Sequence, residues 1–202
     1  MFVLAAAIAL SSLQLVNVKS EAVTYRGREA VKLIESAPGK DVETVAILKD
    51  SSFTNGVIEA ELAGLPGPGA SDGARGFVGI AFRVNGDGTR YECFYLRPTN
   101  GRADDQLRRN HATQYVSHPD HPWYRLRKEN PGVYESYADL VPGEWTKIRI
   151  EVDGAKARLY VNGSPQPVLI VNDLKHGAGA AGAIALWIGP GTEAYFGKLT
   201  VR

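Results

Sequence analysis

Cysteine is almost absent from this chain. Cys93 is the only cysteine among 202 residues, so no disulfide can form within the chain and a small cystine-stapled scaffold is excluded. Net charge is lacking too, because 23 Lys and Arg face 22 Asp and Glu. No overall field therefore draws in nucleic acid or an acidic membrane surface. A chain of this length can bury a sufficient core without covalent staples.

Long hydrophobic runs are also missing, apart from one at the start. Residues 1–10 are apolar and two serines follow. The run is too short to span a bilayer as a helix, and it resembles the apolar part of a secretory signal peptide, although no Lys or Arg follows Met1. We predict that residues 1–14 are a signal peptide or its remnant, with a buried N-terminal strand as the alternative. Residues 15–202 would then form a single exported domain, secreted or periplasmic, without a transmembrane segment.

Turn residues, in contrast, are abundant, with 22 Gly and 11 Pro. They separate short segments that are rich in β-branched and aromatic residues. Pairs such as Asn55-Gly56, Asp153-Gly154 and Asn162-Gly163 are typical of hairpin turns that need positive φ. No long helical period is present. The pattern predicts an all-β fold, an antiparallel two-sheet jelly-roll sandwich with one long ordered loop excursion.

Two hairpins can be assigned from alternation. From Trp145 to Val152, apolar residues or Thr alternate with Lys, Arg and Glu, which indicates a strand with one solvated face. In the second hairpin, Phe77–Val84 is expected to pair with Tyr91–Arg97, with Val78, Ile80, Phe82 and Val84 on the core face. A symmetric turn would place Arg83 directly opposite Glu92. An unpaired buried Arg is costly, so we expect that face to be wet, covered by polar groups, or ion-paired.

The stretch from Pro98 to Pro142 breaks the strand pattern. A connection of this length without regular structure is usually functional or disordered. Its five aromatic residues argue against disorder, which is normally poor in aromatics. We expect an ordered excursion that covers one sheet face or one end of the sandwich, with a short helix near Ala103–Arg109.

Several short motifs resemble the concanavalin A-like lectin/glucanase superfamily. They are Phe53–Leu62, Gly79–Arg83, Tyr91-Glu92, Gly143–Ile150 and Leu159–Gly163. The same order occurs in laminin G-like modules and in the 3-keto-disaccharide hydrolase domain family, often labelled family 16-like glycoside hydrolases. The resemblance extends from the region of Val45 to the C-terminus. Its motifs are mostly turn and core residues, so it implies the fold more than a chemistry.

The resemblance carries two expectations about catalysis. Family 16 glucanases have Glu and Asp carboxylates alternating on one strand, whereas here Ala60 stands between Glu59 and Glu61, so that retaining mechanism is not supported. Similarity to the 3-keto-disaccharide hydrolases would instead place Arg83 and Glu92 in the site. Glu92 would act as acid or base and Arg83 would position the substrate. The alternative is a cross-strand ion pair without catalytic function.

Arginine is concentrated between Arg97 and Lys128, where seven bases oppose three aspartates. Guanidinium groups favour bidentate recognition of hydroxyl pairs or carboxylates, and aromatic faces stack on pyranose rings. We therefore predict a saccharide-binding surface, while for any single arginine an ion pair that pins the loop is the alternative. The candidate ligand-binding residues are Arg83, Tyr91, Arg97, Arg102, Asp104, Asp105, Arg108, Arg109, Tyr115, His118, His121, Trp123, Tyr124 and Arg125.

Three of the four histidines lie in the same stretch. His111 is a second candidate catalytic residue, in addition to Glu92. His118 and His121 offer a metal-binding or general-base pair, but their spacing matches no strong zinc signature. Surface or hydrogen-bonded histidines are the alternative.

Oxygen ligands for calcium are present at Asn100, Asp104 and Asp105. Hard oxygen ligands on a loop suit calcium, yet these residues follow no EF-hand pattern. Carboxylates that cap the loop are the simpler interpretation. We predict no bound metal or other cofactor, with calcium left open.

Three functions remain open from sequence. The first is a lectin-like carbohydrate-recognition domain of an exported, bacterial-type protein, with the ligand on the concave face near the 98–142 excursion. The second is a glycoside hydrolase or lyase resembling the 3-keto-disaccharide hydrolases. The third is a laminin G-like adhesion module. Each predicts a saccharide or a protein as partner and none predicts nucleic acid, while the sugar and the oligomeric state stay undetermined.

Overall fold

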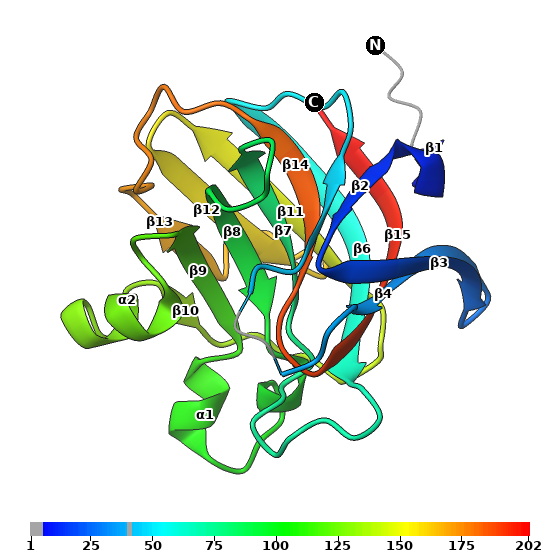
Figure 1. Cartoon of the computed structure of the whole chain (residues 1–202). Coiled ribbons are helices and arrows are strands. Elements are labelled where there is room, and N and C mark those ends of the chain that lie inside the picture. Colours follow the sequence, from blue (N-terminus) through cyan, green and yellow to red (C-terminus); the bar gives the residue numbers. More distant parts are fainter. Residues whose placement is uncertain (1–5, 40–41) are drawn as a thin grey trace.

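The protein is a sandwich of two antiparallel sheets, seen in a computed structural model that describes residues 6–39 and 42–202 (Figure 1). The first sheet has eight strands. In spatial order they are β13 (Leu169–Val171), β12 (Lys156–Val161), β11 (Thr146–Asp153), β6 (Gly56–Pro66), β15 (Thr192–Val201), β4 (Arg28–Glu35) and β3 (Val18–Tyr25), with β1 (Ala6–Ala7) pairing with β15.

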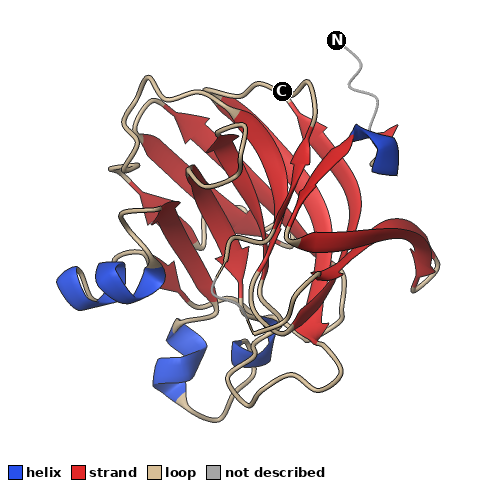
Figure 2. Cartoon of the chain, viewed as in Figure 1, coloured by secondary structure: helices blue, strands red, loops and turns tan. Residues whose placement is uncertain are grey.

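The second sheet has seven strands. Their order is β10 (Glu135–Ser136), β9 (Thr113–His118), β8 (Tyr91–Leu96), β7 (Val78–Val84), β14 (Ala183–Ile188), β5 (Val45–Leu48) and β2 (Leu13–Val16). Helical turns are few and short, and strands dominate the molecule (Figure 2). The predicted all-β, two-sheet sandwich is confirmed.

The main core lies between the two sheets and follows from period-two alternation. In β11, Ile148, Ile150 and Val152 are buried, and Lys147 and Glu151 point outward, as the sequence predicts. On the other sheet, the core is formed by alternate residues of β7 and β8. This interior is the largest hydrophobic cluster of the described residues, and burial of this kind stabilises the fold by roughly 25 cal/mol per Å².

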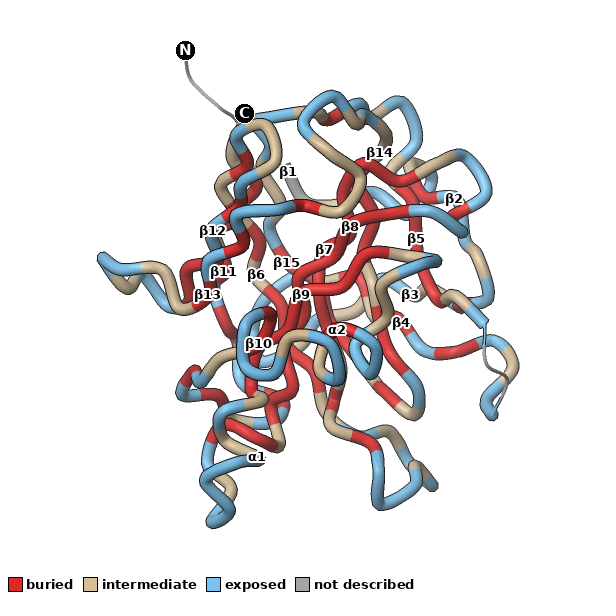
Figure 3. The backbone as a smooth tube through the Cα atoms, turned by 90° about the vertical axis from the view of Figure 1, so that its left-hand side faces the viewer, coloured by how far each residue is buried: buried red, intermediate tan, exposed pale blue. Residues whose placement is uncertain are grey.

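The central strands of the seven-stranded sheet are buried on both of their faces. Every residue of β7 and β8 is buried, and β9 is nearly so (Figure 3). The residues that point away from the main core form a second hydrophobic cluster that includes Ala81, Cys93, Tyr95 and Val116. A strand buried on both sides needs cover over its outer face, and here aromatic side chains provide much of it.

The 98–142 excursion contains more regular structure than the sequence indicates. It comprises the 3-10 turn η2 (Pro98–Asn100), α1 (Gln106–Asn110), β9, α2 (Trp123–Glu129) and β10. The short helix expected near Ala103–Arg109 is present as α1, and Asp105 caps it by accepting a hydrogen bond from the backbone N–H of Arg108 at 2.7 Å. Strand β9, which the sequence did not predict, pairs with β8 over six residues. The sequence of β9 is largely polar and shows no strand-like alternation. Neighbouring elements bury the strand, rather than its own hydrophobic residues.

The expected pairing of Arg83 with Glu92 is wrong by one residue. Phe82, not Arg83, lies opposite Glu92. Arg83 has a φ of 55°, and the register against β14 shifts at this point, which marks a bulge in β7. The bulge reverses alternation, so Val84 joins the outer cluster instead of the main core.

The N-terminal segment was predicted as a signal peptide over residues 1–14. Residues 1–5 of that segment lie outside the described residues. Of the rest, Ala6 and Ala7 pair with β15, and Leu13 is buried at the start of β2. Whether the segment is cleaved stays a prediction. In the part of the chain that the structure describes, no helix has both the length and the apolar character needed to cross a membrane.

Candidate functional site

One transverse row of the seven-stranded sheet brings together chemistry that is scattered in sequence. Trp187 lies opposite Gly79, Gly79 opposite Tyr95, Tyr95 opposite Gln114, and Gln114 opposite Glu135. The row crosses five strands, so residues more than 100 positions apart become neighbours. Gly79 has no side chain, and a Cβ there would lie 2.3 Å from the carbonyl oxygen of Phe94. The bulky rings of Trp187 and Tyr95, on either side of Gly79, can therefore approach each other above it.

Those rings belong to an aromatic strip on the outer face, formed by Phe77, Tyr91, Tyr95 and Trp187. Tyr95 and Trp187 stack with ring centres 4.7 Å apart, and Phe77 meets Tyr95 edge-on at 6.1 Å. The indole N–H of Trp187 donates to the hydroxyl of Tyr91 at 3.0 Å. Tyr91 and Tyr95 are buried, whereas Phe77 and Trp187 are partly exposed. The buried rings thus hold the exposed ones in place.

At one end of the strip, polar groups converge on a buried carboxylate. We call this the Glu135 cluster, and its members are Arg97, His111, Gln114, Arg127 and Glu135. Arg127 donates to Glu135 at 2.6 Å and 2.9 Å, Nε2 of His111 lies 3.2 Å from the same carboxylate, and Arg97 lies 3.6 Å away. The Glu135 side chain is only 2% exposed. Charged partners on this scale are needed to hold a carboxylate out of water.

Arg97 joins the cluster to the aromatic strip. Its guanidinium donates to the Tyr95 hydroxyl at 2.8 Å and to the Gln114 side-chain oxygen at 3.0 Å, and it lies 5.0 Å from the centre of the Tyr95 ring. Trp123, at the start of α2, covers this end. Its ring centre is 4.8 Å from the guanidinium of Arg127 and 5.9 Å from that of Arg97, and it stays 44% exposed.

Burial shapes the protonation of this region. Burial lowers the pKa of His111, and the charges of Arg127 and Arg97 add to that effect while Glu135 opposes it. Burial also raises the pKa of Tyr95. His111 is therefore held toward its neutral form and Tyr95 as a phenol, so both present hydrogen-bonding groups rather than charge.

At the other end of the strip lies a second polar group, the Glu43 cluster, made of Glu43, Tyr91 and His118. One oxygen of Glu43 is 2.8 Å from Nδ1 of His118, and the other accepts a hydrogen bond from the Tyr91 hydroxyl. His118 stacks on the Tyr91 ring at 4.8 Å. The strip thus runs between two carboxylate-centred clusters.

Glu92 and Arg83, expected in the site from the family resemblance, lie elsewhere. Glu92 is 0% exposed, and its two oxygens accept hydrogen bonds from the Tyr115 hydroxyl and from the backbone N–H of His176. Arg83 is 1% exposed and donates to the carbonyl oxygens of Thr54, Gly154 and Gly177. Both residues close one end of the sandwich interior, where a saccharide has no access to Glu92. These contacts stabilise the interior, and a catalytic role for Glu92 or a positioning role for Arg83 stays a prediction.

Tyr115 belongs to the same interior group. Burial and the charge of Glu92 raise its pKa far above the usual range, so it remains a neutral donor. His176 has a lowered pKa because it is buried, although Glu92 opposes this. Its Nδ1 has no partner among the described residues, and the same is true of the hydroxyl of Ser117.

Most of the remaining arginines form ion pairs or hydrogen bonds within the excursion, in agreement with the alternative that they fix the loop. Arg102 pairs with Asp139 at 2.7 Å, and both are more than half exposed. Arg108 donates to Asn100 and Thr99, and Asn100 is itself used in the loop rather than free to bind calcium.

The other predicted residues of the excursion are peripheral. Arg125 pairs with Glu129 one turn along α2 at 2.9 Å, and Arg109 donates to the Tyr137 hydroxyl. Asp104 is exposed and Tyr124 is 62% exposed. His121 forms a backbone bridge to Ser117, and burial lowers the pKa of its imidazole.

Of the predicted residues, Tyr91, Arg97, His111, His118 and Trp123 do meet on the outer face. Sequence reasoning missed their partners, which are Glu43, Phe77, Tyr95, Gln114, Arg127, Glu135 and Trp187. For one of these a signal exists, because period-two alternation puts Tyr95 on the face of Arg97. Trp187 lies on the outer face and is partly exposed.

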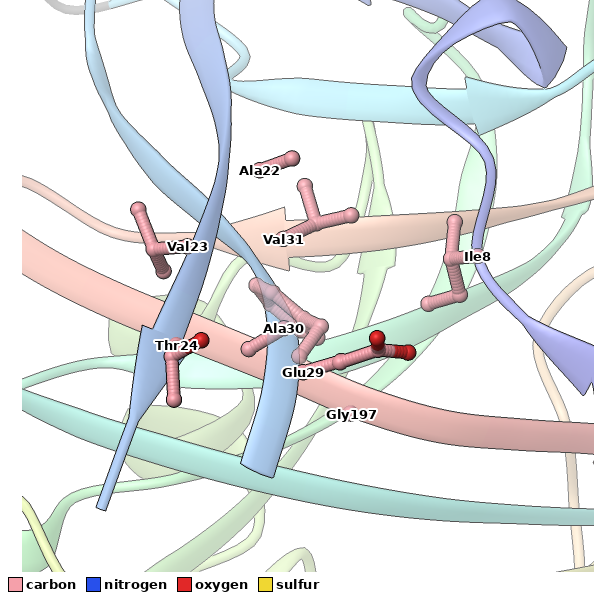
Figure 4. Close-up of a pocket in the computed structure, with 9 residues that line it drawn as sticks. Ile8, Ala22, Val23, Thr24, Glu29, Ala30, Val31 and Gly197 are labelled. Carbon is pink, nitrogen blue, oxygen red and sulfur yellow. The ribbon is translucent and has the colours of Figure 1, made fainter. Parts of the chain in front are cut away.

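Two cavities lie away from this site, on the eight-stranded sheet. One, of about 320 Å³, is bounded by Ile8 and by residues of β3, β4 and β15, with Glu29 as its charged side chain (Figure 4). The other, of about 470 Å³, lies on the outer face over β6, β11, β12 and β15. Neither contains a residue predicted to bind a ligand.

Comparison with known proteins bears on this arrangement. A family model described as a 3-keto-alpha-glucoside-1,2-lyase-like domain matches residues 24–202. Carbohydrate-binding module CBM66 from Bacillus subtilis is similar in structure, with a TM-score of 0.63, 13% sequence identity and 95% of each chain covered. A Bacillus subtilis protein of unknown function with a galectin-like fold has a TM-score of 0.60 and 11% identity, and 96% of this chain and 90% of that chain are covered. None of the curated proteins matches this chain in sequence. These structural similarities support the fold.

Proposed function

Because this chain belongs to the family of 3-keto-alpha-glucoside-1,2-lyase-like domains, we propose that it recognises a saccharide on the outer face of the seven-stranded sheet. The observation that carries the proposal is the aromatic strip with the Glu135 cluster at its end, in one row of the sheet. The similar architecture of a carbohydrate-binding module agrees with this assignment.

The chemistry of the face suits a sugar. A pyranose ring has an apolar face that stacks on aromatic rings and a rim of hydroxyls that need directed hydrogen bonds. Trp123, Trp187 and Phe77 supply exposed or partly exposed rings. Arg127 is 31% exposed at the edge of the Glu135 cluster and can donate to hydroxyl pairs. Rings held by buried partners lose little freedom on binding, which favours affinity.

The same proposal includes export from the cytoplasm. It is supported by the apolar run of residues 1–10, and saccharide polymers are mostly met outside the cell. N-terminal sequencing of protein recovered from the medium or the periplasm tests this. An intact Met1 on that protein contradicts cleavage.

Binding to a panel of oligosaccharides, measured by titration calorimetry with and without calcium, tests the proposed recognition. Trp123→Ala is expected to weaken binding at least tenfold, about 1.4 kcal/mol, since it removes the exposed ring next to Arg97 and Arg127. Tyr124→Ala is the matched control, because this neighbouring exposed ring contacts Trp123 only edge-on at 5.8 Å. Equal loss in both variants, or binding unaffected by either, contradicts the assignment.

A second candidate function is cleavage of the bound saccharide. The family description names elimination across C1 and C2 of a 3-keto-α-glucoside. The Glu43 cluster favours it, since a histidine held by a carboxylate beside a sugar platform is a typical acid–base arrangement. Release of the aglycone from a 3-keto-α-glucoside, followed by NMR, tests this function. A protein that binds such a glycoside without releasing the aglycone is a recognition module only.

A further inference from the structure

The Glu43 cluster holds one imidazole in a defined orientation. Nδ1 of His118 is 2.8 Å from one oxygen of Glu43, and the Tyr91 hydroxyl donates to the other oxygen. The Tyr91 hydroxyl also accepts from the indole N–H of Trp187. With both carboxylate oxygens engaged, Glu43 cannot turn away from the histidine. A hydrogen bond from Nδ1 to a carboxylate leaves Nε2 as the nitrogen with a free lone pair.

Two more contacts restrain the residue. The His118 ring lies nearly parallel to the Tyr91 ring, with an interplanar angle of 17°. Its carbonyl oxygen is 3.0 Å from Nε2 of His176. The His118 side chain is nevertheless 21% exposed, and within residues 6–39 and 42–202 no group makes a hydrogen bond to its Nε2. The free nitrogen therefore belongs to a fixed and partly exposed ring at the end of the aromatic strip.

From this geometry we infer that His118 is the catalytic base for elimination from a 3-keto-α-glucoside, with Glu43 and Tyr91 as positioning residues. The inference rests on the second candidate function. The ketone at C3 acidifies the C2–H bond. Nε2 takes the C2 proton, the electron pair of that bond forms the C1=C2 double bond, and the C1–O bond breaks. Water protonates the departing alkoxide, and His118 returns its proton to water, so no oxidant or reductant is needed.

A purely structural interpretation makes a different prediction. In that case the cluster only ties the segment before β5 to β8 and β9, and any side chain that donates to Glu43 would serve. Asparagine places an amide N–H close to the position of Nδ1 but has no basic nitrogen. His118→Asn therefore separates the two interpretations.

The test uses the full chain with 4-nitrophenyl 3-keto-α-glucoside as probe and release of 4-nitrophenol as readout. We expect His118→Asn to lower kcat by about 10²–10⁴-fold with an unchanged melting temperature, which is the usual range for loss of a general base. His121→Asn is the matched control, since this histidine lies in the same loop but has no side-chain contact to Glu43. It is expected to keep full activity.

A second readout reports proton abstraction directly. Methyl 3-keto-α-glucoside has a poor leaving group, so in D₂O the base should exchange its C2 proton for deuterium, seen by NMR. His118→Asn should abolish this exchange. Glu43→Gln should lower the exchange rate and kcat about 10–100-fold while KM stays nearly constant, because the carboxylate fixes the tautomer and orientation of the imidazole and supports its basicity.

The outcomes separate the proposals. Turnover and exchange that survive His118→Asn overturn the assignment of His118. A native chain that binds these glycosides but neither exchanges nor releases overturns both the base and the cleavage function, and leaves saccharide recognition standing. A native chain that does not bind them at all, nor any sugar of the panel, overturns recognition as well.

Discussion

The two sheets of this sandwich present opposite kinds of outer face. On the eight-stranded sheet, Glu59 pairs with Arg202 at 3.2 Å and Glu61 with Lys147 at 3.8 Å, and these side chains line or border an open groove in water. On the seven-stranded sheet, Glu135 is enclosed by two arginines and a histidine beneath Trp123. On both faces, acidic side chains pair with basic side chains from neighbouring segments. Only on the seven-stranded sheet is the carboxylate shielded from water. Directed hydrogen bonds to a ligand are therefore stronger on that face.

The difference follows from what covers each face. Strands β7, β8 and β9 have buried outer faces because the aromatic strip covers β7 and β8 and α2 packs against β9. The start of β11 is open to water in the structure described, since the Lys147 side chain is 71% exposed. A low-dielectric surrounding strengthens polar contacts, so the same residue types have larger effects on the covered face.

The largest effect is expected from removing the central carboxylate of the covered face. Glu135→Ala leaves Arg97 and His111 without their anionic partner, and should lower the free energy of unfolding by about 3–5 kcal/mol. Urea denaturation measures it. Glu59→Ala on the open face is the matched control, with an expected change within about 0.5 kcal/mol, because both partners are more than 40% exposed. Similar losses in both variants would break the contrast between the faces.

A smaller loss is expected from adding a side chain at Gly79 in the transverse row. Gly79→Ala places a Cβ 2.3 Å from a backbone oxygen of β8, and overpacking of this kind costs about 1–3 kcal/mol. Gly197→Ala in β15 is the control, since a Cβ there meets only side-chain atoms at 3.5 Å. Thermal unfolding of both variants compares them. If Gly79→Ala binds saccharide more weakly than the unsubstituted chain at a temperature where both are fully folded, the row takes part in ligand recognition.

The smallest effect concerns pH. In the fold, burial lowers the pKa of His111, while in the unfolded chain it titrates near about 6.5. Below that pH the unfolded state binds more protons, so the free energy of unfolding should fall as pH decreases below about 6.5. His111→Gln should reduce this slope, which urea titrations at several pH values would show. A slope unchanged by the substitution places the titration at His121 or His176, whose pKa values burial also lowers.

Much of the fold was accessible from local pattern. The alternation in β11, the hairpin turn at Asp153-Gly154 and the helix near Ala103–Arg109 all have their causes within a few residues of sequence, and all three were predicted. Asn55-Gly56 was expected to form a hairpin turn as well, but it links β5 and β6, which lie in different sheets. Strand β9 was not, since its burial depends on β8, β10 and α2 rather than on its own composition. The bulge at Arg83 was not predicted either, because a positive φ at an arginine has no signature in the sequence.

The candidate site divides in the same way. Arg97, His111 and Trp123 stand out in sequence because arginine, histidine and tryptophan cluster in one stretch. Glu135, the partner of Arg97 and His111, and Trp187, the partner of Tyr95, come from different strands, and cross-strand register brings each to its partner. Glu92, which the motif pointed to, is fully buried and lies apart from these residues, and its role as acid or base stays a prediction.

Sequence was therefore sufficient for the architecture, because turn preference and alternation are local and act over two to eight residues. Tertiary structure decided which charges are buried and which rings meet. Burial and cross-strand register are sums over elements distant in the chain. No short motif contains them, and the proposed saccharide site depends on both.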